Sequence, residues 1–402
     1  MSRSALPGYH VITKPIGPLC NLDCSYCFYL KKEDLYSGNR QWKMSPEVLE
    51  SYIQQYIESQ QVSEVGFTWQ GGEPTLLGVD FFRRVVELQR RFANGKTITN
   101  AFQTNGVLLN DEWGEFLAEN SFLIGLSIDG PEDLHDRYRV DKGGKPTFHK
   151  VKRGLDVLLR HAVEFNTLTV VNRANSQHPE DVYEFMKSLG SRVHQYIPLV
   201  ERDDKSGELA PWSVLAEDFG RFMTGIFDRW VAQDVGKIFV QLFEVSLQSW
   251  LGIPAGLCFF RETCGAVLAV EHNGDVYSCD HFVNEPNLLG NLMDNPMAAL
   301  VNSEPQAAFG MAKRDTLPQF CRDCDVRFAC HGECPKNRFL TTPDGEPGLN
   351  YLCAGYKIYF HHIAPYMKFM ANCLRRGMSP LPVMEMARNR SGSSQPSAQS
   401  QH

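Results

Sequence analysis

The sequence has no long hydrophobic run, because none of its segments approaches the ~18 consecutive apolar residues of a membrane-spanning helix. The first residues, MSRSALPGYHVITKPIG, also lack the apolar core of about 7 to 15 residues and the small-residue cleavage site of a signal peptide. We therefore expect no contact with a membrane and a cytoplasmic location, where thiols stay reduced.

An excess of basic charge is also missing. The chain has 40 Lys and Arg against 47 Asp and Glu, which gives a formal net charge of -7. A nucleic-acid-binding domain usually has a basic patch and an isoelectric point above ~9, so we expect no nucleic-acid partner. With 43% hydrophobic and 22% charged residues, the 402-residue chain is predicted to be globular, with roughly two to three domains of ~150 residues.

Cysteine is absent from residues 28–257, although the chain contains 12 cysteines. Cys20, Cys24 and Cys27 precede this gap, and all the others lie between Cys258 and Cys373. A disulfide framework is typical of short secreted chains, along which the cysteines are spread. Two dense groups in a long chain instead indicate metal binding.

Residues 9–200 alternate short β-branched or aromatic runs with helical patterns. We expect strands at 9–13, 64–69, 97–103, 122–128, 166–171 and 192–197. Helices are expected at 45–59, with Ser45 as N-cap and proline in the first position, and at 80–92 and 179–189. This alternation predicts parallel βαβ units with right-handed crossovers, in an open sheet or an incomplete barrel.

The second half of the chain has a different character. Residues 201–211 are polar and predict a linker, and apolar helices are expected at 213–235 and 240–250. Asn273-Gly274 between runs 267–271 and 275–279 is a strong hairpin signal. A final helix is expected at 357–376, kinked at Pro365, before a Ser/Gln-rich tail at 389–402 that we expect to be disordered.

The first cysteine group directly follows the first expected strand. Cys20-x3-Cys24-x2-Cys27 offers three thiolates, whereas a structural zinc needs four ligands and no fourth cysteine lies nearby. A 4Fe-4S cluster held by three cysteines leaves one iron open to a ligand. After the second expected strand comes Gln70-Gly-Gly-Glu-Pro74, whose paired glycines permit close backbone approach to a ligand.

These two motifs resemble those of the radical S-adenosylmethionine (SAM) enzymes. The resemblance implies a partial (β/α)6 TIM-like barrel, a cluster whose open iron chelates SAM, and a Gly-Gly-Glu-Pro turn that binds the SAM amino group. It also implies that SAM is cleaved to a 5′-deoxyadenosyl radical, which abstracts hydrogen from the substrate. The SAM-contacting positions of the family fall on Tyr26, Gly72, Ser127, Arg139 and Val200. Gln70 and Tyr29 are further pocket candidates, and Arg153 is a fallback for Arg139.

Nine cysteines remain. They stand in the order Cys258-x5-Cys264-x14-Cys279, Cys321-x2-Cys324-x5-Cys330-x3-Cys334, Cys353 and Cys373. If Cys373 is set aside, eight thiolates match two four-cysteine sites, which by spacing alone are either iron-sulfur clusters or zinc ribbons.

The run from Cys321 to Cys334 resembles the SPASM domain of peptide-modifying radical SAM enzymes. More closely, the chain from about residue 14 to 366 is similar to the anaerobic sulfatase-maturating enzymes. The matching stretches are Cys27-Phe-Tyr29, Gln70-Gly-Gly-Glu-Pro74, Gln103-Thr-Asn-Gly106, Gly125-Leu-Ser-Ile-Asp-Gly-Pro131, Asn273-Gly-Asp-Val-Tyr277, Cys279-Asp280 and Asn350-Tyr-Leu-Cys353.

This resemblance implies how the chain is divided and how the cysteines are shared. It implies a radical SAM barrel at 1–200, a helical connection at 201–254, a small SPASM domain with a hairpin and helices at 255–376, and a flexible tail at 377–402. Two sets of four cysteines would hold two auxiliary 4Fe-4S clusters. The first set is Cys258, Cys264, Cys279 and Cys334, and the second is Cys321, Cys324, Cys330 and Cys353.

The family oxidises one cysteine or serine of a sulfatase to Cα-formylglycine. The resemblance therefore implies an unfolded or nascent sulfatase polypeptide with a Cys/Ser-x-Pro-x-Arg motif as partner, and a reductant such as flavodoxin or ferredoxin. Asp280, next to Cys279, matches the family's catalytic base. Two alternatives stay open at this point: a SPASM maturase that crosslinks or epimerises a ribosomal peptide, and a zinc-stabilised binding protein without catalysis.

Overall fold

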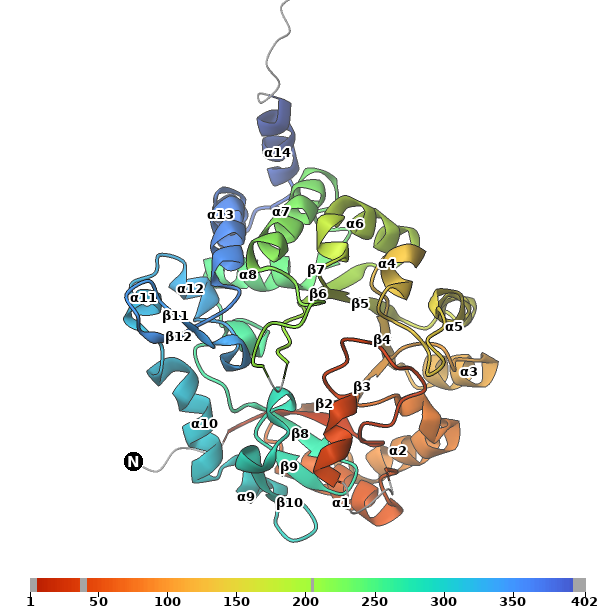
Figure 1. Cartoon of the computed structure of the whole chain (residues 1–402). Coiled ribbons are helices and arrows are strands. Elements are labelled where there is room, and N and C mark those ends of the chain that lie inside the picture. Colours follow the sequence, from red (N-terminus) through yellow and green to blue (C-terminus); the bar gives the residue numbers. More distant parts are fainter. Residues whose placement is uncertain (1–5, 37–41, 204–205, 393–402) are drawn as a thin grey trace, which may run out of the picture. The chain divides into compact units, whose positions relative to one another are not determined.

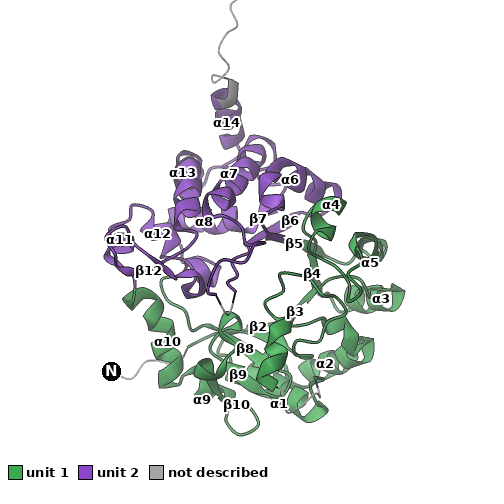
Figure 2. Cartoon of the chain, viewed as in Figure 1, with its two compact units in different colours: residues 1–169, 262–316 green, residues 170–261, 317–402 purple. Residues whose placement is uncertain are grey.

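The structure is a computed structural model that describes residues 6–36, 42–203 and 206–392 (Figure 1). The chain forms two compact units, each assembled from two separate stretches (Figure 2). Unit 1 comprises residues 1–169 and 262–316, and unit 2 comprises residues 170–261 and 317–402. The division at 200, 254 and 376 expected from the sequence stays a prediction. Among the described residues, no helix is both long and apolar enough to cross a membrane.

A sheet of mostly parallel strands forms the centre of unit 1. The strands lie in the order β10-β9-β8-β1-β2-β3-β4-β5, and β1 to β5 pair in parallel in chain order. The predicted alternation of strands and crossover helices is therefore confirmed, with boundaries that differ by one or two residues at most. The strands are β1 (His10–Lys14), β2 (Glu64–Trp69), β3 (Thr97–Thr104), β4 (Leu123–Ser127), β5 (Phe165–Val171), β8 (Val267–Glu271), β9 (Asp275–Tyr277) and β10 (Leu288–Asn291).

The crossover helices begin and end where local chemistry predicts. In α1 the Ser45 hydroxyl accepts a hydrogen bond from the Val48 N–H at 3.3 Å, and proline occupies the first turn, as expected. Buried Leu49, Tyr52, Ile53 and Tyr56 recur at helical spacing and form one apolar face. The helices of unit 1 are α1 (Pro46–Ser59), α2 (Val79–Phe92), α3 (Asp111–Glu119), α4 (Glu132–Asp136), α5 (Phe148–Arg160), α9 (Met297–Val301) and α10 (Glu304–Asp315).

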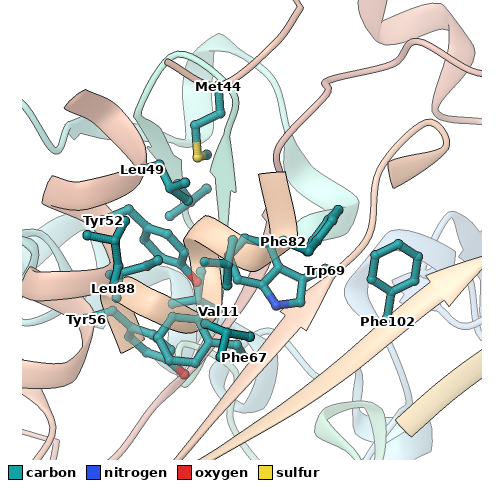
Figure 3. Close-up of a cluster of buried hydrophobic side chains, with 14 of the residues drawn as sticks. Val11, Met44, Leu49, Tyr52, Tyr56, Phe67, Trp69, Phe82, Leu88 and Phe102 are labelled. Carbon is teal, nitrogen blue, oxygen red and sulfur yellow. The ribbon is translucent and has the colours of Figure 1, made fainter. Parts of the chain in front are cut away.

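Aromatic side chains fill the core between the sheet and these helices (Figure 3). The Tyr56 and Phe67 ring centroids lie 4.9 Å apart, edge to face, and those of Trp69 and Phe82 lie 5.7 Å apart in the same manner. Edge-to-face pairs add about 0.5–1.5 kcal/mol beyond the burial of their area. The Trp69 indole N–H donates to Asn100 Oδ1 at 2.8 Å, so its polar atom is also satisfied. This core anchors β1, β2 and β3 just before the loops that carry the sequence motifs.

The expected hairpin is present, and it also extends the main sheet. Strands β8 and β9 pair antiparallel around Gly274, whose φ of +90° is readily adopted by glycine. Strand β8 in turn pairs in parallel with β1, from His10 opposite Val267 to Lys14 opposite Glu271. Strand β9 therefore lies one strand away from β1, and the Lys14 side chain at the end of β1 reaches Asp280 in the residues that follow β9.

Unit 2 is built around two helices in close contact, α7 (Ala216–Gln233) and α13 (Cys353–Arg375). A Cβ atom on Gly355 would stand 1.9 Å from the Ala216 carbonyl oxygen, so only glycine permits this approach. Pro365 lies inside α13. The other elements are α6 (Pro179–Ser188), α8 (Gln241–Leu251), α11 (Gln319–Arg322), α12 (Arg327–Cys330), β6 (Val193–Pro198), β7 (Phe239–Val240), β11 (Leu340–Thr341) and β12 (Pro347–Leu349).

The prediction of a disordered tail at 389–402 is partly wrong. Helix α14 runs over Val383–Gly392, so the first four residues of the stretch 389–402 are helical. Val383 and Ala387 are buried one helical turn apart, and the Arg388 guanidinium donates to the Ala232 carbonyl at the end of α7. These contacts stabilise a helix that the polar composition of the stretch does not predict. Residues 393–402 lie outside the described residues.

Candidate functional site

Three cysteine side chains of the loop after β1 line one pocket of unit 1. The pocket contains no carboxylate or imidazole in its described lining, which instead offers sulfur, apolar side chains and glycine backbone. Such a donor set fits an iron-sulfur cluster, whose irons are bound by cysteine thiolates. The lining residues are Pro18, Cys20, Leu22, Cys24, Cys27, Tyr29, Leu30, Gly71 and Gly72.

The thiols of this pocket are poorly solvated. Burial raises the pKa of the Cys20 thiol to about 12, and the nearby carboxylate of Glu73 raises it further. Burial also raises the pKa of Cys24 to about 12, against the opposing effect of the Arg139 guanidinium, and raises the pKa of Cys27. The thiols of the metal-free chain are therefore protonated near neutral pH, and metal binding must release their protons.

The turn of the Gly-Gly-Glu-Pro motif packs directly on the cysteine loop. The Gly72 N–H donates to the Gly17 carbonyl at 2.7 Å, and the Glu73 N–H donates to the Leu19 carbonyl at 2.8 Å. A Cβ atom on Gly72 would stand 1.8 Å from the Leu19 carbonyl oxygen. The sequence assigns the paired glycines to the approach of a ligand; the structure gives a second reason, which is the approach of the chain's own backbone.

Glu73 connects this turn to the end of β3. Its side chain is 1% exposed; Oε1 accepts from the Thr104 hydroxyl at 2.7 Å and from the Thr75 hydroxyl at 2.6 Å. Oε2 accepts from the Asn105 N–H at 2.8 Å. Burial raises the pKa of this carboxyl, whereas the hydrogen bonds lower it. Hydrogen bonds to Glu73 therefore join two sequence motifs that lie some thirty residues apart, Gly71–Pro74 and Gln103–Gly106.

Tyr26 and Arg139, two of the predicted SAM contacts, meet at a carboxylate. The Tyr26 hydroxyl donates to Asp129 Oδ2 at 2.5 Å. Arg139 places Nε 2.9 Å from Oδ2 and Nη2 3.1 Å from Oδ1 of the same side chain. Asp129 is fully buried, so the pair is shielded from solvent. The Arg139 guanidinium, which is predicted to contact SAM, is thus held in place by a carboxylate of the chain, and its contact with SAM stays a prediction.

A buried histidine supports this ion pair. His135 Nδ1 accepts from the Asp129 N–H at 3.4 Å, so Nε2 carries the proton and donates to the Thr147 hydroxyl at 3.2 Å. That hydroxyl donates to the Arg139 carbonyl at 2.6 Å. Burial lowers the pKa of His135 to about 4, and the imidazole is therefore neutral at physiological pH.

The other predicted SAM contacts lie at separate places. Ser127 is the last residue of β4 and is buried at the carboxyl end of the parallel strands, where ligands of α/β folds bind. Gln70 directly follows β2, and its N–H donates to the Thr13 carbonyl at 2.9 Å. Arg153 is exposed on α5. Val200 is buried in unit 2, after β6, and its contact with SAM stays a prediction.

The predicted base, Asp280, forms a buried ion pair. It begins the short 3-10 helix η5 (Asp280–Phe282) after β9 and is 8% exposed. Its Oδ1 stands 2.5 Å from Lys14 Nζ, and the Lys14 side chain is 1% exposed. The same ammonium lies 4.4 Å from the centroid of the Tyr29 ring, which lines the cysteine pocket. One lysine therefore contacts both the predicted base and a wall of the pocket.

Tyr29 is fixed at its other end by a second buried acid. Its hydroxyl donates to Glu271, the residue opposite Lys14 in the β1–β8 ladder. Burial and the Glu271 carboxylate both raise the pKa of Tyr29, so its hydroxyl remains a donor. His272 Nδ1 lies 3.3 Å from the other Glu271 oxygen. The pairing of β8 with β1 thus organises the side of the pocket that faces Asp280.

A second group of four cysteines lines a pocket of unit 2. Cys321 and Cys330 come from α11 and α12, Cys324 from the turn between them, and Cys353 from the first turn of α13. They are the set that the resemblance implies for the second auxiliary cluster. Burial raises the pKa of Cys330 to about 12 and that of Cys353 to about 11.

The remaining set is divided between the two units. Cys264 and Cys279 belong to unit 1, and Cys258 and Cys334 belong to unit 2. Their shared ligation of the first auxiliary cluster stays a prediction. Cys373 is buried near the end of α13 and does not line the pocket of Cys353. Within the described ranges, no three His, Cys, Asp or Glu side chains stand close enough to hold a single metal ion.

Three charged residues of the site are not identified by the sequence patterns. Lys14 is the last residue of β1, one residue beyond the strand expected at 9–13. The only sign of its role in the sequence is that it stands shortly before the cysteine loop. Asp129 lies within the motif Gly125–Pro131, but the sequence does not indicate that Arg139 is its ion-pair partner; only the folded chain shows this. Glu271 ends an apolar strand and becomes visible as part of the site only through the pairing with β1.

Comparisons with known proteins agree with this arrangement. Residues 15–186 match the radical SAM superfamily, and residues 258–325 match SPASM, an iron-sulfur cluster-binding domain. Over 390 residues the chain is 47% identical to a serine-type anaerobic sulfatase-maturating enzyme of Bacteroides thetaiotaomicron, covering 94% of each chain. It is 33% identical over 378 residues to a cysteine-type enzyme of Clostridium perfringens, covering 92% of this chain and 100% of that one.

A solved structure described as native anSMEcpe with bound AdoMet and Cp18Cys peptide superposes with a TM-score of 0.81 at 32% identity. The match covers 90% of this chain and 98% of that one. The radical SAM fold and the SPASM domain that the resemblance implies are therefore confirmed as the fold class. The chain belongs to the anaerobic sulfatase-maturating enzymes, which are radical SAM enzymes with a SPASM iron-sulfur domain.

Proposed function

We propose that this protein oxidises one residue of a sulfatase polypeptide to Cα-formylglycine under anaerobic conditions, with serine as its preferred substrate residue. The observation that carries the proposal is the match along nearly the whole chain to a serine-type enzyme, at 47% identity against 33% for a cysteine-type enzyme. The buried pair of Asp280 and Lys14, in the same unit as the cysteine loop, supports it from the chemistry of the site.

The enzyme uses SAM and 4Fe-4S clusters, as its family does. SAM bound at a reduced cluster supplies the radical chemistry that removes a hydrogen atom from the substrate Cβ. Cys20, Cys24 and Cys27, which line one pocket, would hold that cluster. Tyr26, Gly72, Ser127, Arg139 and Val200 bind SAM, and the Asp129 carboxylate keeps the Arg139 guanidinium in one orientation.

Asp280 acts on the proton of the substrate side chain. Formation of the aldehyde from serine requires the loss of a Cβ hydrogen atom, the hydroxyl proton and one electron. The Asp280 carboxylate accepts the proton, and Lys14 holds that carboxylate in position. Two auxiliary clusters would take up the electron; Cys258, Cys264, Cys279 and Cys334 would hold one, and Cys321, Cys324, Cys330 and Cys353 would hold the other. Cys279, the neighbour of Asp280 in the sequence, would be a ligand of the first of these clusters.

The protein substrate is an unfolded or nascent sulfatase segment with a Ser- or Cys-x-Pro-x-Arg motif. A buried base reaches a substrate side chain only if the segment enters the site in an extended form, before the sulfatase folds. A low-potential carrier such as flavodoxin or ferredoxin supplies the electron for SAM cleavage. Reduced thiols at eleven ligand positions require a reducing compartment, which supports a location in the cytoplasm.

The assay that tests the proposal uses matched peptides that differ only in Ser or Cys at the modified position. The anaerobically reconstituted enzyme is given SAM, a reductant and either peptide. We expect 5′-deoxyadenosine, a mass loss that corresponds to formylglycine, and a higher kcat/KM for the serine peptide. A preference for cysteine would overturn the serine assignment. Formation of 5′-deoxyadenosine with neither peptide modified would overturn the sulfatase assignment and leave the radical SAM chemistry intact.

The role of Asp280 is tested with Asp280→Asn, for which we expect continued SAM cleavage with little formylglycine. The matched control is Asp294→Asn, an exposed residue of the same unit whose substitution should leave both products unchanged. Full aldehyde formation by Asp280→Asn would show that this carboxylate is not the base.

A further inference from the structure

We infer that Asn105 is a positioning residue of the cysteine loop and raises the reduction potential of the cluster that Cys20 binds. Asn105 is buried just after β3, with Nδ2 2.8 Å from Asn21 Oδ1 and 3.8 Å from Cys20 Sγ. The inference rests on the proposed ligation by Cys20 and is independent of the identity of the protein substrate.

The orientation of the Asn105 amide follows from its other bonds. Its Oδ1 accepts from the Val107 N–H at 3.0 Å, which requires an oxygen at that position. The NH₂ group is therefore the end that faces Asn21 and Cys20. The backbone N–H of Asn105 donates to Glu73 Oε2, so the residue is fixed from both sides. A donor held this firmly loses little conformational entropy when it contacts a sulfur atom.

Few polar atoms approach the sulfur of Cys20. In the described structure its hydrogen-bond donors are the Leu22 N–H, at 3.4 Å, and the Asn105 amide. Hydrogen bonds to cluster sulfurs stabilise the reduced cluster, which carries the additional negative charge, and this is one of the means by which proteins set cluster potentials. The Glu73 carboxylate acts in the opposite sense, since its charge disfavours negative charge at Cys20. The Asn105 amide therefore offsets a carboxylate that the turn needs for its structure.

The same contacts give the Gln103–Gly106 motif a role at the reactive centre. Glu73 belongs to the turn that packs on the cysteine loop, and it holds the Asn105 backbone. Asn105 in turn contacts two consecutive residues of that loop, Cys20 and Asn21. The turn, the motif and the first cluster ligand are thus joined by a closed set of hydrogen bonds, and Asn105 is the member that contacts the ligand.

The variants Asn105→Asp and Asn105→Ala test the hydrogen-bond donor of the side chain separately from its acceptor and its shape. Aspartate keeps the acceptor for Val107 and the shape of the side chain but replaces the donor with an oxygen. Alanine removes the donor without adding charge. The matched control is Asn94→Asp, at an exposed position with a φ of +48°, a conformation that both residues tolerate.

The measurement is a redox titration of the reconstituted full-length protein, followed by electron paramagnetic resonance. The cluster of interest is the one whose signal changes when SAM is added. At the midpoint potential of the wild type, we expect the ratio of reduced to oxidised cluster to fall about tenfold in Asn105→Asp, or 59 mV for one electron. We expect a fall of about threefold in Asn105→Ala, as for a neutral hydrogen bond of modest strength, and no change in Asn94→Asp.

The outcomes are distinct. An unchanged potential in both variants, with wild-type iron content, would overturn the inference. A shift in Asn105→Asp without one in Asn105→Ala would also overturn it, because the added charge alone would then act. If aspartate prevents cluster assembly, the alanine variant decides. Absence of any SAM-sensitive signal in the wild type would instead contradict the proposed ligation by Cys20, Cys24 and Cys27.

Discussion

Replacing Gly72 with alanine should remove the SAM-binding cluster while leaving the rest of the chain folded. The new Cβ would stand 1.8 Å from the Leu19 carbonyl oxygen, whereas ordinary contact begins at 3.4 Å. The turn and the cysteine loop must therefore separate by about 1.6 Å, since both contacting groups are backbone and neither can rotate away.

The size of the effect follows from what this separation breaks. The hydrogen bonds from Gly72 and Glu73 to the cysteine loop, at 2.7 and 2.8 Å, would both exceed bonding distance. Each is worth about 1 kcal/mol net, and overpacking costs a further ~1–3 kcal/mol. The local arrangement of the loop is therefore destabilised by about 3 to 5 kcal/mol, enough to disperse the three thiols in most molecules.

Iron content and SAM binding measure this outcome after anaerobic reconstitution. Three 4Fe-4S clusters correspond to about twelve irons per chain, and loss of the one at the cysteine loop leaves about eight. We expect the variant to bind no SAM and to form no 5′-deoxyadenosine. Gly66→Ala is the control, since it lies in the preceding strand β2 and its Cβ would meet Thr99 Oγ1 at an acceptable 3.4 Å. A Gly72→Ala protein with full iron and normal SAM affinity would refute the steric argument.

Three further predictions follow from buried groups. Lys14→Met removes the ammonium that forms the buried ion pair with Asp280, so the free energy of unfolding in urea should fall by about 3–5 kcal/mol and formylglycine formation should be lost; unchanged stability would contradict this. His135 and His194 have a pKa of about 4 in the folded chain against an ordinary 6.5, so the unfolded chain takes up protons first as the pH falls. Stability should therefore be greatest above pH 6.5 and decline towards pH 4, by up to about 3 kcal/mol per histidine, and equal urea midpoints at pH 7 and pH 5 would refute it. Gly355→Ala should force α13 away from α7 and lower the melting temperature, and it should also reduce the iron held in unit 2, as measured by iron analysis; a fully loaded, equally stable variant would show that the helices can move apart without cost.

The sequence predicts elements whose signals are local. Strand β2 and helix α1 lie where expected because an apolar alternating run and a Ser45-Pro46 start are independent of the rest of the fold. The three cysteines of the first loop are equally local, and one short turn suffices to bring them to one pocket. Contacts between motifs that are separated by many residues are harder to predict. The hydrogen bond between Asn105 and Glu73 can form only because β2 and β3 pair.

Long-range pairing accounts for most of what the sequence does not predict. The parallel contact of β8 with β1 joins residues more than 250 positions apart, and no periodicity in either strand indicates the partner. The ion pair of Lys14 with Asp280 depends on such packing, whereas Arg139 and Asp129 are only ten residues apart and are brought together by the local path of the chain. Helix α14 was missed for another reason: its apolar contacts are few, and the polar composition around them is typical of disorder.

The ladder between β1 and β8 has a consequence for how this protein can be divided. A chain shortened to the barrel segment would leave β1 as an open edge, with unpaired N–H and carbonyl groups beside apolar side chains. Such an edge recruits other chains, so we expect the shortened protein to aggregate rather than to fold as a smaller enzyme. The two segments that match separate families therefore depend on each other during folding, because β1 acquires its second neighbour in the sheet only after residues 267–271 have been synthesised.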